Sequence, residues 1–336
     1  MAAYTAIDDP EAYFQVKTFT VSGGTQSITL DGDTDMQPDL LWIKSSGDAN
    51  PHTVVDSVRG ATKIMWTNVT AAEDNFTDEV TAFGSDGFTL GASSNAYTNE
   101  SSEPQVAYCW KESATSGFDI VTYTGDGNAS RTIAHSLSAV PHVMLFKERS
   151  EARDWAVYHH KNTSAPETDF LILNTTAATA DDDGFLDDTA PTSSVFTVDT
   201  FSEVNKADQT YVNYIFSEKQ GFSKFGSYTG NGNADGPFVY TGFRPAMIII
   251  KATATTDNWT TYDNKRPGYN SGNYFLFPNL SNAEDTSNST WIDILSNGFK
   301  PLITSSTLNT SGNQYIYMAF AEAPFVNSKG VPCNAR

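Results

Sequence analysis

The sequence predicts an all-β protein that consists of three tandem antiparallel β-sandwich domains of jelly-roll or lectin-like type. Three observations lead to this prediction: a composition that favours strands, an internal repeat, and turn residues between short apolar segments. The chain has 336 residues, which is too long for one ordinary core and suits two or three domains.

The composition is poor in charge and rich in aromatic side chains. Aromatic residues make up 12% of the chain and charged residues 18%, whereas a typical soluble protein is about a quarter charged. Thr, Ser, Asn and Gly replace the missing charge. Threonine and aromatic side chains favour the half-buried surface of a pleated sheet. The composition therefore favours strands.

Several landmarks recur at a fixed spacing along the chain. An aromatic residue in the first predicted strand occurs as Phe19, Tyr123 and Tyr228, at spacings of 104 and 105 residues. Each is followed by a proline, an apolar run and a lysine. These pairs are Pro38 and Lys44, Pro141 and Lys147, and Pro245 and Lys251. Their common order and spacing indicate three diverged copies of one unit.

Further landmarks support the same three units. A tryptophan follows the second and third lysines by eight residues, at Trp155 and Trp259, and His52 takes this position in the first unit. Each unit then has a short strand with a Gly-Phe signature and a final apolar strand. The short strands begin at Gly87-Phe88, Val195-Phe196 and Gly298-Phe299, and the final strands span 106–110, 212–216 and 316–320.

The landmarks divide the chain into five parts. The three units are assigned to residues 14–113, 118–218 and 222–323, with an N-terminal arm at 1–13 and a C-terminal tail at 324–336. The arm belongs to no unit, yet it contains apolar residues such as Tyr4 and Ile7. Two interpretations stay open: a segment that attaches the protein to a partner, and an N-terminal strand packed on the first sandwich.

Each unit reads as a series of short strands. The first strand alternates apolar and polar residues, Asn-Gly and Asp-Gly turns follow, and the run after each proline is apolar on both sides. One strand buried on both faces among alternating strands is typical of two packed sheets. We expect no helix longer than a single turn, at residues 71–74 and 281–284.

Charge excludes several classes of partner. The formal net charge is −20 and the pI is about 4.4, so the surface repels nucleic-acid phosphates and anionic membranes. The N-terminal residues have no apolar core of a signal peptide, and no run reaches the roughly 18 apolar residues that span a membrane. We therefore expect neither nucleic-acid binding nor membrane insertion.

No catalytic template is present, so we expect a protein that is not an enzyme, with no catalytic residues and no cofactor. The sequence lacks a Gly-x-Ser-x-Gly elbow, a His-Glu-x-x-His zinc motif and a phosphate-binding loop. Trp155 and Trp259 are expected in the core, and Cys109 is expected to be a buried, inert thiol. A pair of carboxylates for glycoside hydrolysis stays open, since two of the 40 acidic residues need only meet in the fold.

Two features are candidates for ligand binding. Asp31, Asp33 and Asp35 alternate as in a calcium loop, but Trp42 stands where the bidentate acid is needed, and a solvated turn is favoured over a Ca²⁺ site. Tyr269 lies between a glycine and an asparagine in a predicted loop, and it is the candidate aromatic that faces a ligand.

Several phrases resemble a repeat family of tailed-phage virion proteins, often from marine phages, that serve as tail fibres or structural proteins. The matching phrases are residues 56–63, 83–91, 225–232, 240–245 and 317–325, and the resemblance covers nearly the whole chain. It implies a virion component made in the host cytoplasm and carries over no functional residues. One departure is Ser22-Gly23, where the family favours Gly-Asn-Gly.

The resemblance implies a structural protein displayed on the particle surface. A tail-fibre or receptor-binding protein for host attachment is the first expectation, and capsid decoration is the alternative, since the chain has no repeat shaft. A carbohydrate-active enzyme is the third and least favoured. The expected partners are other tail or capsid proteins, further copies of the chain (a trimer is favoured), and a host-surface glycan.

Overall fold

The computed structural model describes residues 4–93, 97–100, 102–266, 270, 274–286 and 291–333. Nearly all regular structure in these ranges is strand, and every strand pair is antiparallel, which confirms the all-β class. The helices in these ranges are one turn each, η1 (Pro10–Ala12) and α1 (Ser202–Asn205). The predicted turns at 71–74 and 281–284 are not helical. The assignment to a jelly-roll or lectin-like type stays a prediction.

The first unit contains two sheets. The larger has the strand order β1-β9-β3-β4-β5-β6, and the smaller has the order β2-β8-β7. The strands of the large sheet are β1 (Phe14–Thr20), β9 (Pro104–Trp110), β3 (Leu40–Ser45), β4 (Thr53–Asp56), β5 (Lys63–Trp66) and β6 (Asp74–Asn75). Those of the small sheet are β2 (Gln26–Thr29), β8 (Gly87–Leu90) and β7 (Val80–Gly84).

The second unit repeats this order. Its large sheet contains β10 (Phe118–Thr124), β17 (Thr210–Phe216), β12 (Val143–Glu148), β13 (Trp155–His159), β14 (Asp169–Ile172) and β15 (Ala180–Asp181). Its small sheet pairs β11 (Arg131–Ala134) with β16 (Val195–Val198).

The third unit follows the same plan, with fewer strands in the described part of its large sheet. That sheet contains β18 (Ser223–Thr229), β24 (Gln314–Pro324), β20 (Phe243–Ala252) and β21 (Thr260–Asp263). The small sheet contains β19 (Val239–Tyr240), β23 (Gly298–Pro301) and β22 (Ile292–Leu295). Pro38 and Pro141 precede their strands as expected, but Pro245 lies inside β20, where the register with β24 shifts. Such a shift tolerates a residue without an N–H.

The large sheets are buried on both faces. In β3, Leu41 and Ile43 belong to a cluster that includes Ile28 and Phe88 of the small sheet. The alternate residue Trp42 points to the other face and joins a cluster that contains residues of all three units. The predicted strand that is apolar on both sides is thus confirmed, and its second face is covered by the other units.

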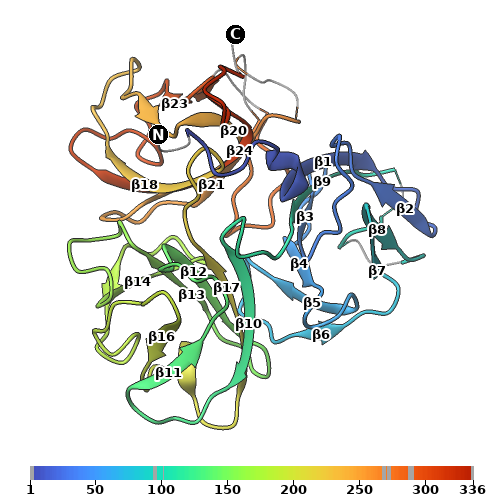
Figure 1. Ribbon diagram of the computed structural model, residues 1–336. Coiled ribbons are helices and arrows are strands. Elements are labelled where there is room, and N and C mark those ends of the chain that lie inside the picture. The colour runs from blue at the N-terminus through green and yellow to red at the C-terminus, as the bar shows by residue number, and fades with distance from the viewer. Residues whose placement is uncertain are drawn as a thin grey trace.

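The shared cluster lies where the three units meet, and Figure 1 shows the units as three lobes around a common centre. Phe320 of the third unit lies in this cluster and contacts aromatic rings of the other two units. Its ring centroid is 4.9 Å from that of Phe14, 5.5 Å from that of Trp110 and 5.7 Å from that of Phe216. The chain therefore closes into a ring with approximate threefold symmetry and one common core.

The N-terminal arm packs within the same chain. Ala6 N–H and Thr5 Oγ1 both donate to the Gln220 carbonyl, which lies between the second and third units, at 2.9 and 3.0 Å. Ile7 is buried in the shared cluster, and Ser328 N–H donates to Asp8 at 2.7 Å. Burial removes Ile7 from water, so the arm contributes to the shared core. The arm also contacts the first unit, since Thr34 Oγ1 donates to Asp9 at 2.6 Å and Gln15 Nε2 donates to the Glu11 carbonyl at 2.9 Å. Its described residues add no strand to the first unit.

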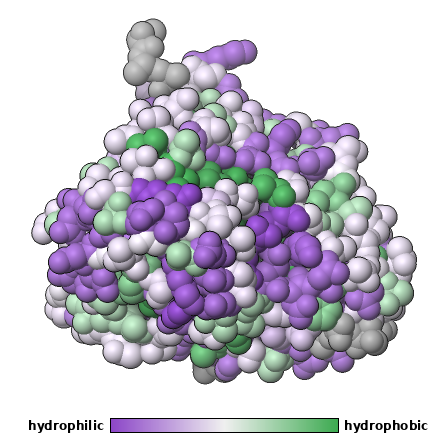
Figure 2. Space-filling view, turned by 90° about the horizontal axis from the view of Figure 1, so that it is seen from below, coloured by the Kyte–Doolittle hydropathy of each residue, from purple (hydrophilic) through white to green (hydrophobic). Residues whose placement is uncertain are grey.

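Polar groups dominate the outer surface. The face seen in Figure 2 is mostly hydrophilic or neutral, with hydrophobic residues gathered mainly in one band. Few large hydrophobic side chains of the described residues are exposed: Tyr4, Val58, Val69, Val140, Phe238, Tyr240 and Val331. Within the described ranges, no helix has the length and apolar character needed to cross a membrane.

Candidate functional site at the junctions between units

The lysines that mark the repeat are buried at the junctions. Lys147 Nζ donates to the Thr70 carbonyl of the first unit at 3.2 Å, and Lys251 Nζ donates to the Thr176 carbonyl of the second unit at 3.2 Å. Lys44 donates to carbonyls of its own unit. Burial is the main cause that lowers the pKa of all three ammonium groups to about 8. Two of the three repeated lysines therefore join units, and all three are buried instead of forming a charged surface.

The repeated tryptophans also cross the junctions. Trp155 Nε1 donates to the Trp66 carbonyl of the first unit at 2.9 Å, and Trp259 Nε1 donates to the Ile172 carbonyl of the second at 3.0 Å. Both are buried, which confirms the expectation that they are core residues. His52 occupies the equivalent place. The backbone N–H groups of these three residues each donate to an asparagine side chain, Asn68, Asn174 or Asn279.

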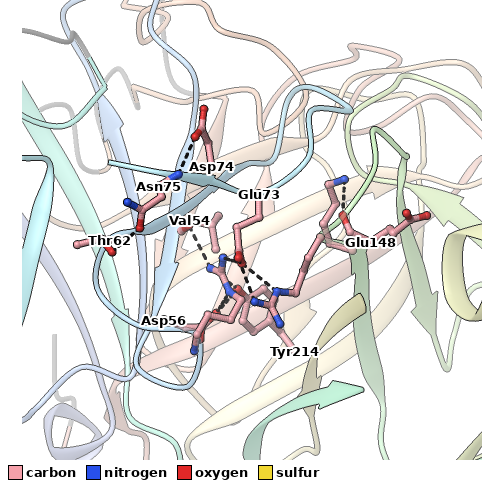
Figure 3. A network of polar contacts seen from close by, with 11 residues as sticks. Val54, Asp56, Thr62, Glu73, Asp74, Asn75, Glu148 and Tyr214 are labelled. Atoms are coloured by element: carbon pink, nitrogen blue, oxygen red, sulfur yellow. Dashed lines mark hydrogen bonds and ion pairs between the residues drawn. The ribbon is translucent and has the colours of Figure 1, made fainter. Parts of the chain in front are cut away.

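A buried ionic network joins the first and second units (Figure 3). Arg59 Nε pairs with Asp56, and both side chains are fully buried. Arg59 also binds Glu73 at 2.9 Å, and Arg149 of the second unit binds the same carboxylate at 2.9 Å. Tyr214 of the second unit donates its hydroxyl to Asp56 at 2.6 Å. Each buried charge thus has a partner of opposite sign, as burial requires.

The junction between the third and first units repeats this network. Arg266 Nε binds Asp263 at 2.6 Å, and Arg266 Nη1 binds Glu284 at 3.2 Å. Tyr108 of the first unit donates to Asp263 at 2.9 Å. Burial alone would lower the pKa of this arginine, but Asp263, Tyr108 and Glu284 together raise the pKa above its usual range. Two of the three junctions therefore share one design.

The junction between the second and third units departs from that design. His159 lies at the position of the aspartate, and Asn162 lies three residues later, at the position of the arginine. The Lys161 N–H donates to His159 Nδ1 at 3.1 Å, so Nδ1 is an acceptor and the ring proton lies on Nε2. Nε2–H then donates to the Tyr317 carbonyl at 3.2 Å. Burial, followed by the neighbouring His160, lowers the pKa of His159 to about 3. This junction depends on a neutral histidine.

We expect acid to weaken the molecule through His159. Below pH about 6.5 the unfolded chain takes up a proton that folded His159 refuses down to about 3. The free energy of unfolding should therefore fall on acidification, by about 1.4 kcal/mol per pH unit for this one group. Urea unfolding of the wild type and of His159→Gln between pH 7 and 4 measures the effect, and the variant should show the smaller slope.

The control for this experiment is His135→Gln, at a partly exposed histidine of an outer loop. It should leave the wild-type slope unchanged. Equal slopes for the wild type and His159→Gln would contradict the prediction, because they would show that His159 does not cause the loss of stability in acid.

An open cavity lies at the same junction. Its volume is about 490 Å³, and its walls include His142, Glu218 and Lys224. Glu218 is held by the Lys224 ammonium at 2.8 Å and by the Phe225 N–H at 2.8 Å. The Glu218 N–H in turn donates to His142 Nδ1 at 3.1 Å. The cavity presents hydrogen-bonding groups in a fixed arrangement and has room for a small polar molecule.

One carboxyl pair meets at the junction between the first and second units. Burial, and then the hydrogen bond with Asp119, raises the pKa of Glu112 to about 7. Glu112 accepts the Ile120 N–H at 3.1 Å, and Asp119 accepts the Ser136 N–H. Backbone amides thus donate to both carboxyl groups of the pair.

The candidate ligand residues do not form a site together. Asp31 pairs with Lys17, and all three aspartates Asp31, Asp33 and Asp35 have exposed side chains in one bend. Among the described residues there is no group of three side chains that could hold a metal ion. Tyr269 lies outside the described residues.

Sequence reasoning missed the asparagines that hold the turn after each first strand. Asn205 Oδ1 accepts the Asp126 N–H at 3.1 Å, and Asn309 Oδ1 accepts the Asn231 N–H at 2.8 Å. Asn99 likewise accepts a turn N–H, and its side-chain amide donates to the Gly24 carbonyl. The first unit therefore has the same asparagine contacts, although its turn sequence differs at Ser22-Gly23. The signal was present in the sequence, since these asparagines recur at spacings of 106 and 104 residues.

Comparison with known protein families gives one result. Residues 9–324 match a family described as a domain of unknown function (DUF7483). A search of curated proteins finds no match.

Proposed function

We propose that this chain, which belongs to the DUF7483 family over nearly its whole length, is a non-enzymatic structural protein on the surface of a tailed-phage virion. Its role there would be that of a tail-fibre or receptor-binding protein, in line with the resemblance of its repeated phrases to such proteins. The observation that carries the proposal is the closed ring of three β units around one core. Buried ion pairs at two junctions hold the units in place, and each unit also has loops on its outer side (Figure 1). A rigid body with many outer loops suits adhesion.

Capsid decoration is the second candidate. It is favoured by the compact three-lobed shape, which includes no fibrous shaft in the described part of the chain (Figure 1). A decoration protein needs a stable body that sits on the shell and exposes its outer loops. The same ring meets this need.

The proposed partners are other virion proteins of the tail or the capsid, a host-surface glycan, and further copies of the chain in a trimer. The three units already enclose their shared core within one chain, so a trimer would form through outer surfaces. The net charge of −20 argues against nucleic acid and against anionic membranes as partners.

The location of the protein on native virions tests the proposal. We expect gold-labelled antibodies against the purified protein to mark intact particles of the phage that encodes it, at the tail tip for a receptor-binding protein. Labelling over the head would favour decoration. Particles that lack the protein altogether would refute both candidates, and antibody depleted with the purified protein is the control.

A further inference from the structure

The cavity between the second and third units has an aromatic rim. Tyr4 of the N-terminal arm and Tyr240 of the third unit line it, and each is 59% exposed. Most other large aromatic side chains of the described residues are buried. Both tyrosines therefore expose ring surface beside the polar residues of the cavity wall.

The cavity lies at one of three equivalent glutamate positions in the repeat. Each unit has a glutamate two residues after its last core aromatic: Glu112, Glu218 and Glu322. Glu112 is paired with Asp119, and Glu322 binds Arg244 at 2.7 Å beside a cavity of only about 10 Å³ that Glu11 of the arm helps to close. Of these three related sites, the one at Glu218 opens into a volume of about 490 Å³.

We propose that this cavity binds an uncharged hexopyranoside. A pyranose has an apolar face of C–H groups, which suits a tyrosine ring, and a rim of hydroxyls that both donate and accept hydrogen bonds. Tyr240 supplies the ring at the rim. Glu218 and Lys224, which bind each other at 2.8 Å, place an acceptor beside a donor at the spacing of neighbouring hydroxyls.

Size and charge narrow the ligand class. A volume of about 490 Å³ falls in the range of about 300–1,000 Å³ typical of small-molecule sites, enough for one or two sugar rings. The Glu218 carboxylate at the floor and the net charge of −20 disfavour acidic sugars. The ligand is therefore a neutral hexose or N-acetylhexosamine.

This inference deepens the proposed function, because it rests on that function for the source of the sugar, a host-surface glycan. The binding itself does not depend on where the protein sits in a virion. Binding without virion labelling would retain the site and overturn the proposed function, while labelling without binding would do the reverse.

The test is saturation-transfer NMR with the full chain and separate methyl glycosides of glucose, galactose, mannose and N-acetylglucosamine. At least one glycoside should bind with a dissociation constant in the range of about 1–10 mM, typical of one sugar ring on a shallow site. Tyr240→Ala should weaken that binding by about tenfold, the loss of one aromatic contact. Lys224→Gln should weaken it as well, through the lost ammonium donor.

Phe238→Ala is the matched control, because Phe238 is 50% exposed and lies two residues from Tyr240 but does not line the cavity. It should bind as the wild type does, and thermal unfolding should show that all variants remain folded. The proposal is overturned if no glycoside binds to the wild type at about 20 mM. It is also overturned if folded Tyr240→Ala binds as well as Phe238→Ala.

Discussion

Phe320→Ala is expected to lower the free energy of unfolding by about 3–5 kcal/mol, the cost of truncating a fully packed phenylalanine. Phe320 contacts Phe14 and Trp110 of the first unit and Phe216 of the second. The cavity left by its ring would open where all three units meet, so no single unit could repack around it. Urea unfolding followed by tryptophan fluorescence measures the change.

The exposed Phe238 provides the control for this variant as well. Phe238→Ala should change the free energy of unfolding by less than about 0.5 kcal/mol, as most surface substitutions do. We further expect wild-type unfolding to be one transition, because the units share a core. A Phe320→Ala protein as stable as Phe238→Ala, or three separate transitions in the wild type, would contradict the shared core.

Arg59→Met is expected to cost about 3–5 kcal/mol, because it leaves the fully buried Asp56 without its cation. Tyr214 would still donate to Asp56, but a hydroxyl does not neutralise a carboxylate. The loss of stability should be localised at the junction between the first and second units. Chemical denaturation at pH 7 measures the stability, and hydrogen exchange of β5 and β17 locates the weakened contact.

Lys206→Met is the matched surface variant, since the ion pair of Lys206 with Glu151 is partly exposed. Its loss should cost at most about 1 kcal/mol, because water screens an exposed pair. Removing both partners with Asp56→Leu and Arg59→Met should recover much of the stability, since no buried charge then stays unpaired. If Arg59→Met costs no more than Lys206→Met, the buried network does not hold the junction.

The strands and turns of each unit could be read from the sequence. Alternation in 14–20 and the apolar run after Pro38 correspond to β1 and β3. The Gly-Phe signature at 87–88 begins β8. These signals are local, because side chains alternate across a strand and glycine favours tight turns. Repetition strengthened these signals, because a weak pattern does not recur three times at one spacing by chance.

Candidate site residues were harder to predict for a physical reason. An ion pair such as Arg59 with Asp56 has a local signal, but its third partner, Tyr214, lies in another unit. The arm illustrates the same limit, since its sequence left open whether it packs on the protein or binds a partner, and Ile7 is buried in the shared core. The cavity at Glu218 depends on how two units and the arm approach one another, which no local pattern encodes.

The sequence by itself determined that this protein is all-β and contains three copies of one unit, because periodicity and turn chemistry are properties of neighbouring residues. Only the tertiary structure decided what covers the second face of each large sheet. A residue such as Trp42 must be buried, but its hydrophobicity does not say against what, because the hydrophobic effect has no direction. The closing of three units into one ring supplied that answer, and it placed the repeated lysines and tryptophans at the junctions.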